Sequence, residues 1–91
     1  MVVDIDELIW DQVNTEHIKK HEVNQAELYQ ACRIQLKVLL VKKNRILLIG
    51  KTKTNRLLSI VLDLVDNNNY YVVSARDSSR KERRLVNEEI N

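Results

Sequence analysis

The stretch Leu57–Val65 reads Leu-Leu-Ser-Ile-Val-Leu-Asp-Leu-Val, and it decides the fold class. From Leu58 onward every second residue is Leu or Ile, whereas the alternate positions include Ser59 and Asp63. Successive side chains of a strand point to opposite sides, so this spacing gives one fully apolar face and one mixed face. The pattern predicts a central strand that is covered mainly on one face.

Three further apolar runs flank this strand in the sequence. They are Leu36–Val41, Ile46–Ile49 and Tyr70–Ser74, and they are rich in β-forming residues. Lys42–Asn44 and Asn67–Asn69 separate neighbouring runs, and Asn accepts the left-handed backbone of tight turns. The four runs therefore predict an antiparallel meander.

The residues before the meander predict a strand and two helices. Ile5–Trp10 is interpreted as a short edge strand. Asn14 is predicted to cap a helix that runs to about His21. Asn24 is predicted to cap a second helix through residue 33, with Glu27 at the third helical position as its capping-box partner.

A third helix follows the meander. Asp77-Ser78-Ser79 is predicted to cap a helix from Arg80 to about Ile90, with Glu82 in its first turn. The order is then a short strand, two helices, four antiparallel strands and a helix. This is an α+β architecture in which two helical segments pack on one face of the meander, and 91 residues suffice for one domain, 1–91.

Composition narrows the class of protein. Apolar residues make up 44% of the chain and charged residues 31%, which is typical of a folded domain, and the absence of Phe predicts an aliphatic core. A lone cysteine, Cys32, offers no internal disulfide and fits a reducing compartment. The acidic start and the short apolar runs give no signal peptide or membrane span, so we expect a cytoplasmic location without membrane attachment.

Charge is distributed unevenly along the chain. Residues 1–16 carry a net −5, residues 17–60 carry +8 and residues 61–91 carry −1, which gives the overall +2. The basic middle and the cluster Arg80–Arg84 suit a polyanion such as RNA. Ordinary solvated lysines and arginines account for the same pattern, so charge alone leaves both readings open.

Short motifs follow one another in a fixed order between Leu8 and Glu89. They are Trp10-Asp11, Lys20-His21-x-Val23, Glu27, Arg45-Ile-Leu-Leu-Ile-Gly50, Arg56-Leu57-Leu58, Ser74-Ala75-Arg76 and Arg80-x-Glu82-Arg83-Arg84. This ordered set resembles the BrnT family of ribonuclease toxins from bacterial toxin–antitoxin pairs. The resemblance implies a single toxin-like domain with a RelE-like fold and endoribonuclease activity that inhibits translation. It also implies a cognate ribbon-helix-helix antitoxin, with operator DNA bound only through that antitoxin.

RNA cleavage without a metal needs a proton acceptor for the ribose 2′-hydroxyl, a proton donor for the leaving oxygen, and cations for the developing phosphorane charge. Imidazole titrates near neutral pH and suits proton transfer, whereas the planar guanidinium binds phosphate with paired bonds. No cofactor is required. The candidate catalytic residues are His21, Arg76 and Arg80, and the candidate RNA- or phosphate-binding residues are Lys20, Arg56 and Arg83.

Structural alternatives exist for these residues. His21 alternatively ends a helix, and Arg80–Arg84 alternatively form a solvated helix face. Glu82 is interpreted first as a carboxylate that favours the helix amino terminus, and otherwise as a base or an orienter of an arginine. His17 and His21 share a helical face, but no third ligand follows with suitable spacing, so no metal site is predicted.

Two positions depart from the family pattern. Glu22 stands where the family has glycine, and Val86 stands where it often has tyrosine. Two hypotheses therefore remain: an active endoribonuclease toxin, or a catalytically inactive homologue that acts as an antitoxin-binding module or a nucleic-acid binder.

Overall fold

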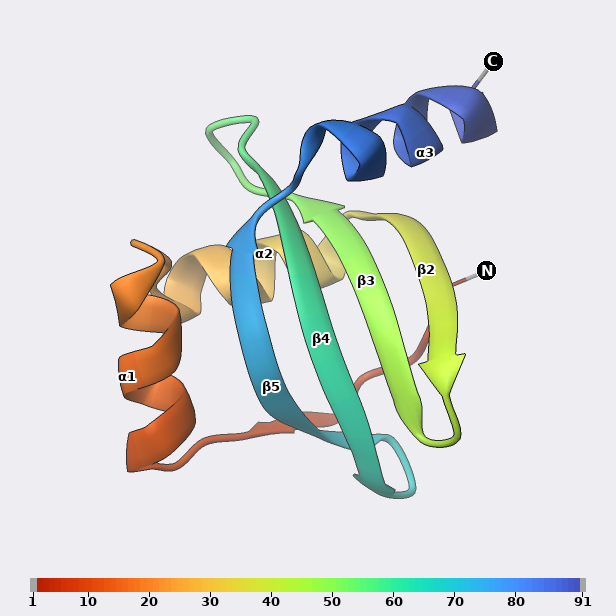
Figure 1. Ribbon diagram of the computed structural model, residues 1–91. Coiled ribbons are helices and arrows are strands. Elements are labelled where there is room, and N and C mark those ends of the chain that lie inside the picture. Colours follow the sequence, from red (N-terminus) through yellow and green to blue (C-terminus); the bar gives the residue numbers. More distant parts are fainter. Residues whose placement is uncertain (1, 91) are drawn as a thin grey trace.

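The computed structural model describes residues 2–90, which form one sheet and three helices (Figure 1). The elements in chain order are β1 (Glu7–Ile9), α1 (Gln12–Lys20), α2 (Gln25–Arg33), β2 (Gln35–Lys42), β3 (Arg45–Lys51), β4 (Leu57–Asp66), β5 (Asn69–Asp77) and α3 (Arg80–Ile90). The predicted α+β class and element order are confirmed. No helix in the described range is long and apolar enough to cross a membrane.

The sheet is five-stranded with the order β1-β5-β4-β3-β2. Its last four strands form the predicted antiparallel meander, and β1 joins the edge of β5 in parallel. Asn44 and Asn67 adopt positive φ angles of 66° and 45° in the two predicted turns, and Asn55 does so at 66° between β3 and β4. Asparagine tolerates this left-handed backbone, so it replaces glycine in a chain with a single Gly.

Two helices cover one face of the sheet, and the main core lies between them and the strands (Figure 1). Ile18 of α1 and Leu28 of α2 are fully buried against the even-numbered apolar residues of β4. Gly50 lets α2 approach β3 closely, because a Cβ at this position would overlap the backbone carbonyl of Ala31. The one glycine of the chain is therefore fixed by helix–sheet packing.

The first helix begins earlier than predicted, so the assignment of Asn14 as its cap is wrong. Asp11 is the N-cap, and its carboxylate accepts from the Asn14 N–H at 2.9 Å. The Asn14 side chain is instead buried, and its Nδ2 donates to the carbonyls of Ile9 at 2.9 Å and Val72 at 3.0 Å. It satisfies strand carbonyls that water cannot reach, and Asp11 provides equivalent cap chemistry one turn earlier.

The second helix begins as predicted. Asn24 accepts from the Glu27 N–H at 2.8 Å, and the Glu27 carboxylate accepts from the Asn24 N–H at 3.2 Å. This reciprocal capping box fixes the orientation of Glu27 at the start of α2.

The third helix crosses one end of the sheet, on the face opposite α1 and α2. Its residue Glu82 bonds to Ser59, which lies on the other face of β4 from Leu58 and Ile60. Val86 follows Glu82 by one helical turn and is buried, and Ile49 is the fully buried cross-strand neighbour of Ser59. The helix therefore covers one end of this second face.

The two adjacent tyrosines of β5 differ in burial. Tyr70 is buried in the core, whereas Tyr71 is half-exposed and its hydroxyl donates to Asp11 at 3.0 Å. The bond from the Asn14 N–H, followed by this bond from Tyr71, lowers the pKa of the Asp11 carboxyl.

Substitution of Gly50 by alanine should lower the free energy of unfolding by about 3 kcal/mol, because the new methyl group displaces the backbone of α2. Chemical denaturation followed by circular dichroism measures the change. Lys51→Ala on the same strand is the matched control and should cost less than about 0.5 kcal/mol. Equal stability of G50A and the wild type would contradict the close packing of α2 on β3.

Candidate active site at one end of the sheet

Four segments meet at the upper end of the sheet in Figure 1. They are the turn between α1 and α2, the start of β4, the end of β5 and the start of α3. All six sequence-predicted site residues lie in or beside these segments: Lys20, His21, Arg56, Arg76, Arg80 and Arg83.

Arg56 connects three of the segments. Its Nε donates to the Asp77 carboxylate at 2.7 Å, and its Nη1 donates to Glu27 Oε2 at 3.0 Å. Its guanidinium also donates to the backbone carbonyls of Glu22 at 2.7 Å and His21 at 3.3 Å. These contacts occupy most of its five N–H donors and lower the pKa of the Asp77 carboxyl. Arg56 thus holds the α1–α2 turn against the end of β5.

Arg76 lies at the end of β5 and forms a two-bond ion pair with Glu82. Its Nη1 donates to Glu82 Oε1 at 2.7 Å and its Nη2 donates to Oε2 at 2.9 Å. The Arg76 side chain remains 45% exposed, whereas Glu82 is only 12% exposed. The carboxylate therefore holds one edge of the guanidinium and leaves part of it open to solvent.

Glu82 is itself fixed from several sides. It accepts from the Ser79 N–H at 2.7 Å in a capping box and from the Ser59 hydroxyl at 2.9 Å. The bond from Arg76, followed by those from Ser79 and Ser59, lowers the pKa of Glu82 to about 2. A carboxyl with so low a pKa is a poor proton acceptor near neutral pH. Of the three roles considered for Glu82, the geometry fits the orientation of an arginine and the capping of α3.

Sequence reasoning missed the role of Ser59, which donates to this carboxylate, and of Ser78, which contacts Ser59. Ser59 and Ser78 are both buried, and their hydroxyl oxygens are 2.8 Å apart. Ser59 is also the cross-strand partner of Arg76 in the β4–β5 ladder. A lone hydroxyl within the apolar run of β4 was the available signal, because a buried hydroxyl needs a partner. Asp77 was also missed, since it was assigned only to helix capping.

His21 is exposed and ends α1, and its backbone N–H donates to the Ile18 carbonyl at 3.1 Å. Its ring meets His17 edge-on, with ring centroids 5.3 Å apart. Arg56 links the His21 carbonyl to the end of β5, so the turn and the Arg76 segment are joined through one guanidinium. The adjacent Lys20 is exposed in the last turn of α1.

Arg80 and Arg83 lie in the first turn of α3 and are exposed. Arg83 Nε donates weakly to the Ser78 carbonyl at 3.4 Å. A helix amino terminus favours anions, so two cations beside it give a positive region next to Arg76. In the part of the chain that the structure describes, no three His, Cys, Asp or Glu side chains converge to hold a metal ion.

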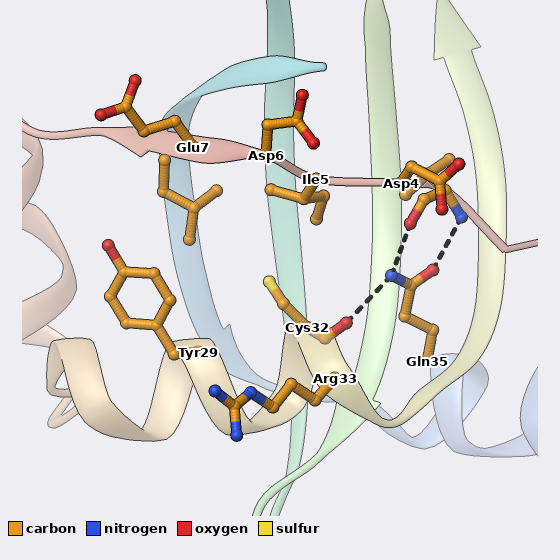
Figure 2. Close-up of a pocket in the computed structure, with 10 residues that line it drawn as sticks. Asp4, Ile5, Asp6, Glu7, Tyr29, Cys32, Arg33 and Gln35 are labelled. Carbon is orange, nitrogen blue, oxygen red and sulfur yellow. Dashed lines mark hydrogen bonds between the residues drawn. The ribbon is translucent and has the colours of Figure 1, made fainter.

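A separate pocket of about 350 Å³ lies away from these residues, between the segment 3–8 and the end of α2 (Figure 2). Gln35 closes one side by bonding both the N–H and the carbonyl of Val3, each at 2.9 Å. Burial raises the pKa of the Cys32 thiol at its floor to about 12. No predicted site residue lines this pocket, and its thiol is protonated and unreactive at neutral pH.

Comparison with solved structures tests the fold. The crystal structure of the Brucella abortus ribonuclease toxin BrnT matches with a TM-score of 0.67 and 25% sequence identity, over 81% of this chain and 97% of that chain. The chain is BrnT-like. The resemblance inferred from the ordered motifs is therefore confirmed. No family model and no curated protein sequence matches it.

The match is to a toxin that is itself a ribonuclease, so the BrnT-like chain has the fold of a toxin-family protein. The match also covers nearly the whole of the solved toxin chain. The roles of the six site residues in this BrnT-like chain rest on their geometry alone.

The Glu82→Gln variant should be less stable than the wild type at neutral pH, by about 1–2 kcal/mol. The expected cost is modest because Arg76 is half-exposed and water screens the pair. The folded-state pKa of Glu82 lies below its unfolded value of 4.5, so its stabilisation is full above that value. The difference between the two proteins should shrink as the pH falls toward about 2. Urea denaturation from pH 7 to pH 2 measures it, and a constant difference would contradict the low pKa.

The Arg56→Lys variant keeps the charge but loses the branched donor geometry, so it should lower the free energy of unfolding by about 1–3 kcal/mol. Amide hydrogen exchange should then accelerate in the α1–α2 turn that Arg56 holds. Arg33→Lys, on the exposed end of α2, is the matched control. Unchanged exchange in the turn would show that Arg56 does not hold it.

Proposed function

We propose that this protein is the toxin of a type II toxin–antitoxin pair, a metal-independent endoribonuclease that inhibits translation. One observation carries the proposal: Arg76 is oriented by a bidentate carboxylate beside a positively charged helix amino terminus. A guanidinium fixed in this way stabilises new negative charge without reorganising during the reaction. The BrnT-like fold supports the same conclusion.

The proposed reaction uses the ribose 2′-hydroxyl as the nucleophile. A base takes its proton, the 2′-oxygen attacks the adjacent phosphorus, and the bond to the 5′-oxygen breaks. An acid then protonates that 5′-oxygen, and the products are a cyclic phosphate and a free 5′-hydroxyl. The enzyme holds the nucleophile in line with the leaving oxygen and stabilises the phosphorane.

Each predicted residue has a place in this reaction. His21 transfers protons, since it is exposed and an imidazole can both accept and donate a proton. Arg76 and Arg80 stabilise the phosphorane, and Lys20 and Arg83 bind flanking phosphates. Arg56 was predicted to bind phosphate, but its donors already engage two carboxylates and two carbonyls. We therefore assign it the role of holding His21 near the other residues.

The partners of the proposed toxin are its RNA substrate and a cognate antitoxin of the ribbon-helix-helix class, in the cytoplasm. Operator DNA would be reached only through the antitoxin. No cofactor enters the reaction, because substrate and side chains supply every reacting group.

The second hypothesis is an inactive homologue that binds an antitoxin or a nucleic acid. It is supported by Val86, a buried residue of α3 that stands where the family often has tyrosine. A valine there contributes packing and offers no hydroxyl for proton transfer.

Induced expression of the chain alone should arrest growth and degrade RNA, and the Arg76→Ala/Arg80→Ala variant should lose both effects. Removal of one cation from a phosphorane site typically costs about 100-fold or more in rate. Growth curves and RNA integrity measure the outcome. Lys81→Ala, an exposed cation in the same helix, is the control that should remain toxic.

If the double variant folds and remains fully toxic, the site is wrongly assigned. If the wild-type chain folds but leaves growth and RNA intact, the second hypothesis replaces the first. Val86→Tyr is then the first variant in which to look for restored cleavage.

A further inference from the structure

The outer edge of β2 has no neighbouring strand among residues 2–90, because the sheet ends there. A free edge presents a row of backbone N–H and C=O groups that can pair with another extended chain. Two large apolar side chains on this strand face solvent: Leu40 is 70% exposed and Val41 is 55% exposed. Natural edge strands rarely leave such residues uncovered unless another chain covers them.

A third exposed apolar residue lies at the same end of the sheet. Val65 of β4 is 57% exposed, and the preceding Leu64 N–H donates to the Asn44 carbonyl in the β2–β3 turn at 2.6 Å. This bond brings the end of β4 beside the turn that follows β2. We refer to Leu40, Val41 and Val65 together as the apolar edge.

The charged residues of β2 itself and of the turn that follows it are all positive. The strand β2 contains no Asp or Glu, and Lys42 and Lys43 at its end are exposed. A second copy of this chain pairing edge to edge would place lysines near lysines, which is repulsive. An acidic chain would be attracted instead, so charge complementarity selects an acidic partner over a second copy.

The backbone of the edge selects the class of partner. Another polypeptide in extended form matches the regular spacing of its donors and acceptors and covers the apolar side chains. An RNA strand offers no such ladder, and the edge presents no aromatic side chain on which a base could stack. The strands β3 and β4 also separate β2 from β5, which carries Arg76.

We propose that the outer edge of β2 binds an extended segment of a partner protein, with acidic residues beside apolar ones, which adds a sixth strand to the sheet. None of the candidate site residues lies on β2 itself. A protein could therefore occupy the edge while the site end of the sheet stays open.

The probe for the test is a fluorescein-labelled peptide of about seven residues in which Val alternates with Asp and Glu. One control peptide carries Lys in place of the acids, and another has N-methylated backbone amides. Fluorescence anisotropy measures binding to the full chain, and amide hydrogen exchange locates it. The acidic peptide should bind about 10-fold tighter than the lysine peptide and slow exchange in residues 36–42. The N-methylated peptide should do neither.

Variants of the chain sharpen the test. Leu40→Thr/Val41→Thr should weaken binding of the acidic peptide by about 10-fold without unfolding the chain, because both side chains are exposed. Lys42→Glu/Lys43→Glu should reverse the preference in favour of the lysine peptide. Val13→Thr and Lys53→Glu, which change an exposed apolar residue and an exposed cation elsewhere, should bind like the wild type.

Three outcomes would overturn the proposal. In the first, the acidic peptide leaves the hydrogen exchange of β2 unchanged. In the second, the chain alone sediments as a dimer that L40T/V41T dissociates, which assigns the edge to a second copy. In the third, an RNA oligonucleotide protects β2 in place of the peptide. Toxicity of L40T/V41T is measured in parallel. If this variant binds the peptide weakly but remains toxic, peptide binding and RNA cleavage are separate properties of the chain.

Discussion

The close approach of α2 to β3 is the constraint on which the rest of the structure depends. Gly50 permits it, because any side chain there would meet the Ala31 backbone. With α2 seated, the capping box at its start places Glu27 within reach of Arg56. Arg56 in turn fixes Asp77. The position of Arg76, which precedes Asp77 in β5, therefore depends through these contacts on the absence of a side chain at Gly50.

Local patterns predicted most of the fold. The strands of the meander, the turns at Asn44 and Asn67 and the cap at Asn24 follow from alternation and turn chemistry within a few residues. The cap of α1 did not, because Asp11 and Asn14 are equally good cap residues in sequence. Only the carbonyls of Ile9 and Val72 decide between them, and Val72 is 58 residues away.

The candidate site was predicted in its residues but not in its pairings. The arginines were recognisable as a group, but the acidic partners of Arg56 lie far off in sequence: Glu27 is 29 residues away and Asp77 is 21 residues away. Arg56 and Arg76, which look equivalent in sequence, therefore differ in how their guanidinium groups are engaged. Arg56 is surrounded by acceptors, whereas Arg76 is held on one edge and open on the other. Sequence spacing cannot distinguish an arginine whose donors are engaged within the fold from one that is oriented by a carboxylate and remains open to solvent.

The parallel pairing of β1 with β5 also has a consequence for synthesis on the ribosome. Glu7 pairs with Asn69, so β1 can join the sheet only after β5 has been made. Until then Asn14 cannot bridge the carbonyls of Ile9 and Val72, and the acidic segment around β1 stays unpaired. Such long-range closure delays folding. In a nascent chain this edge of the sheet would thus stay unformed until β5 has emerged.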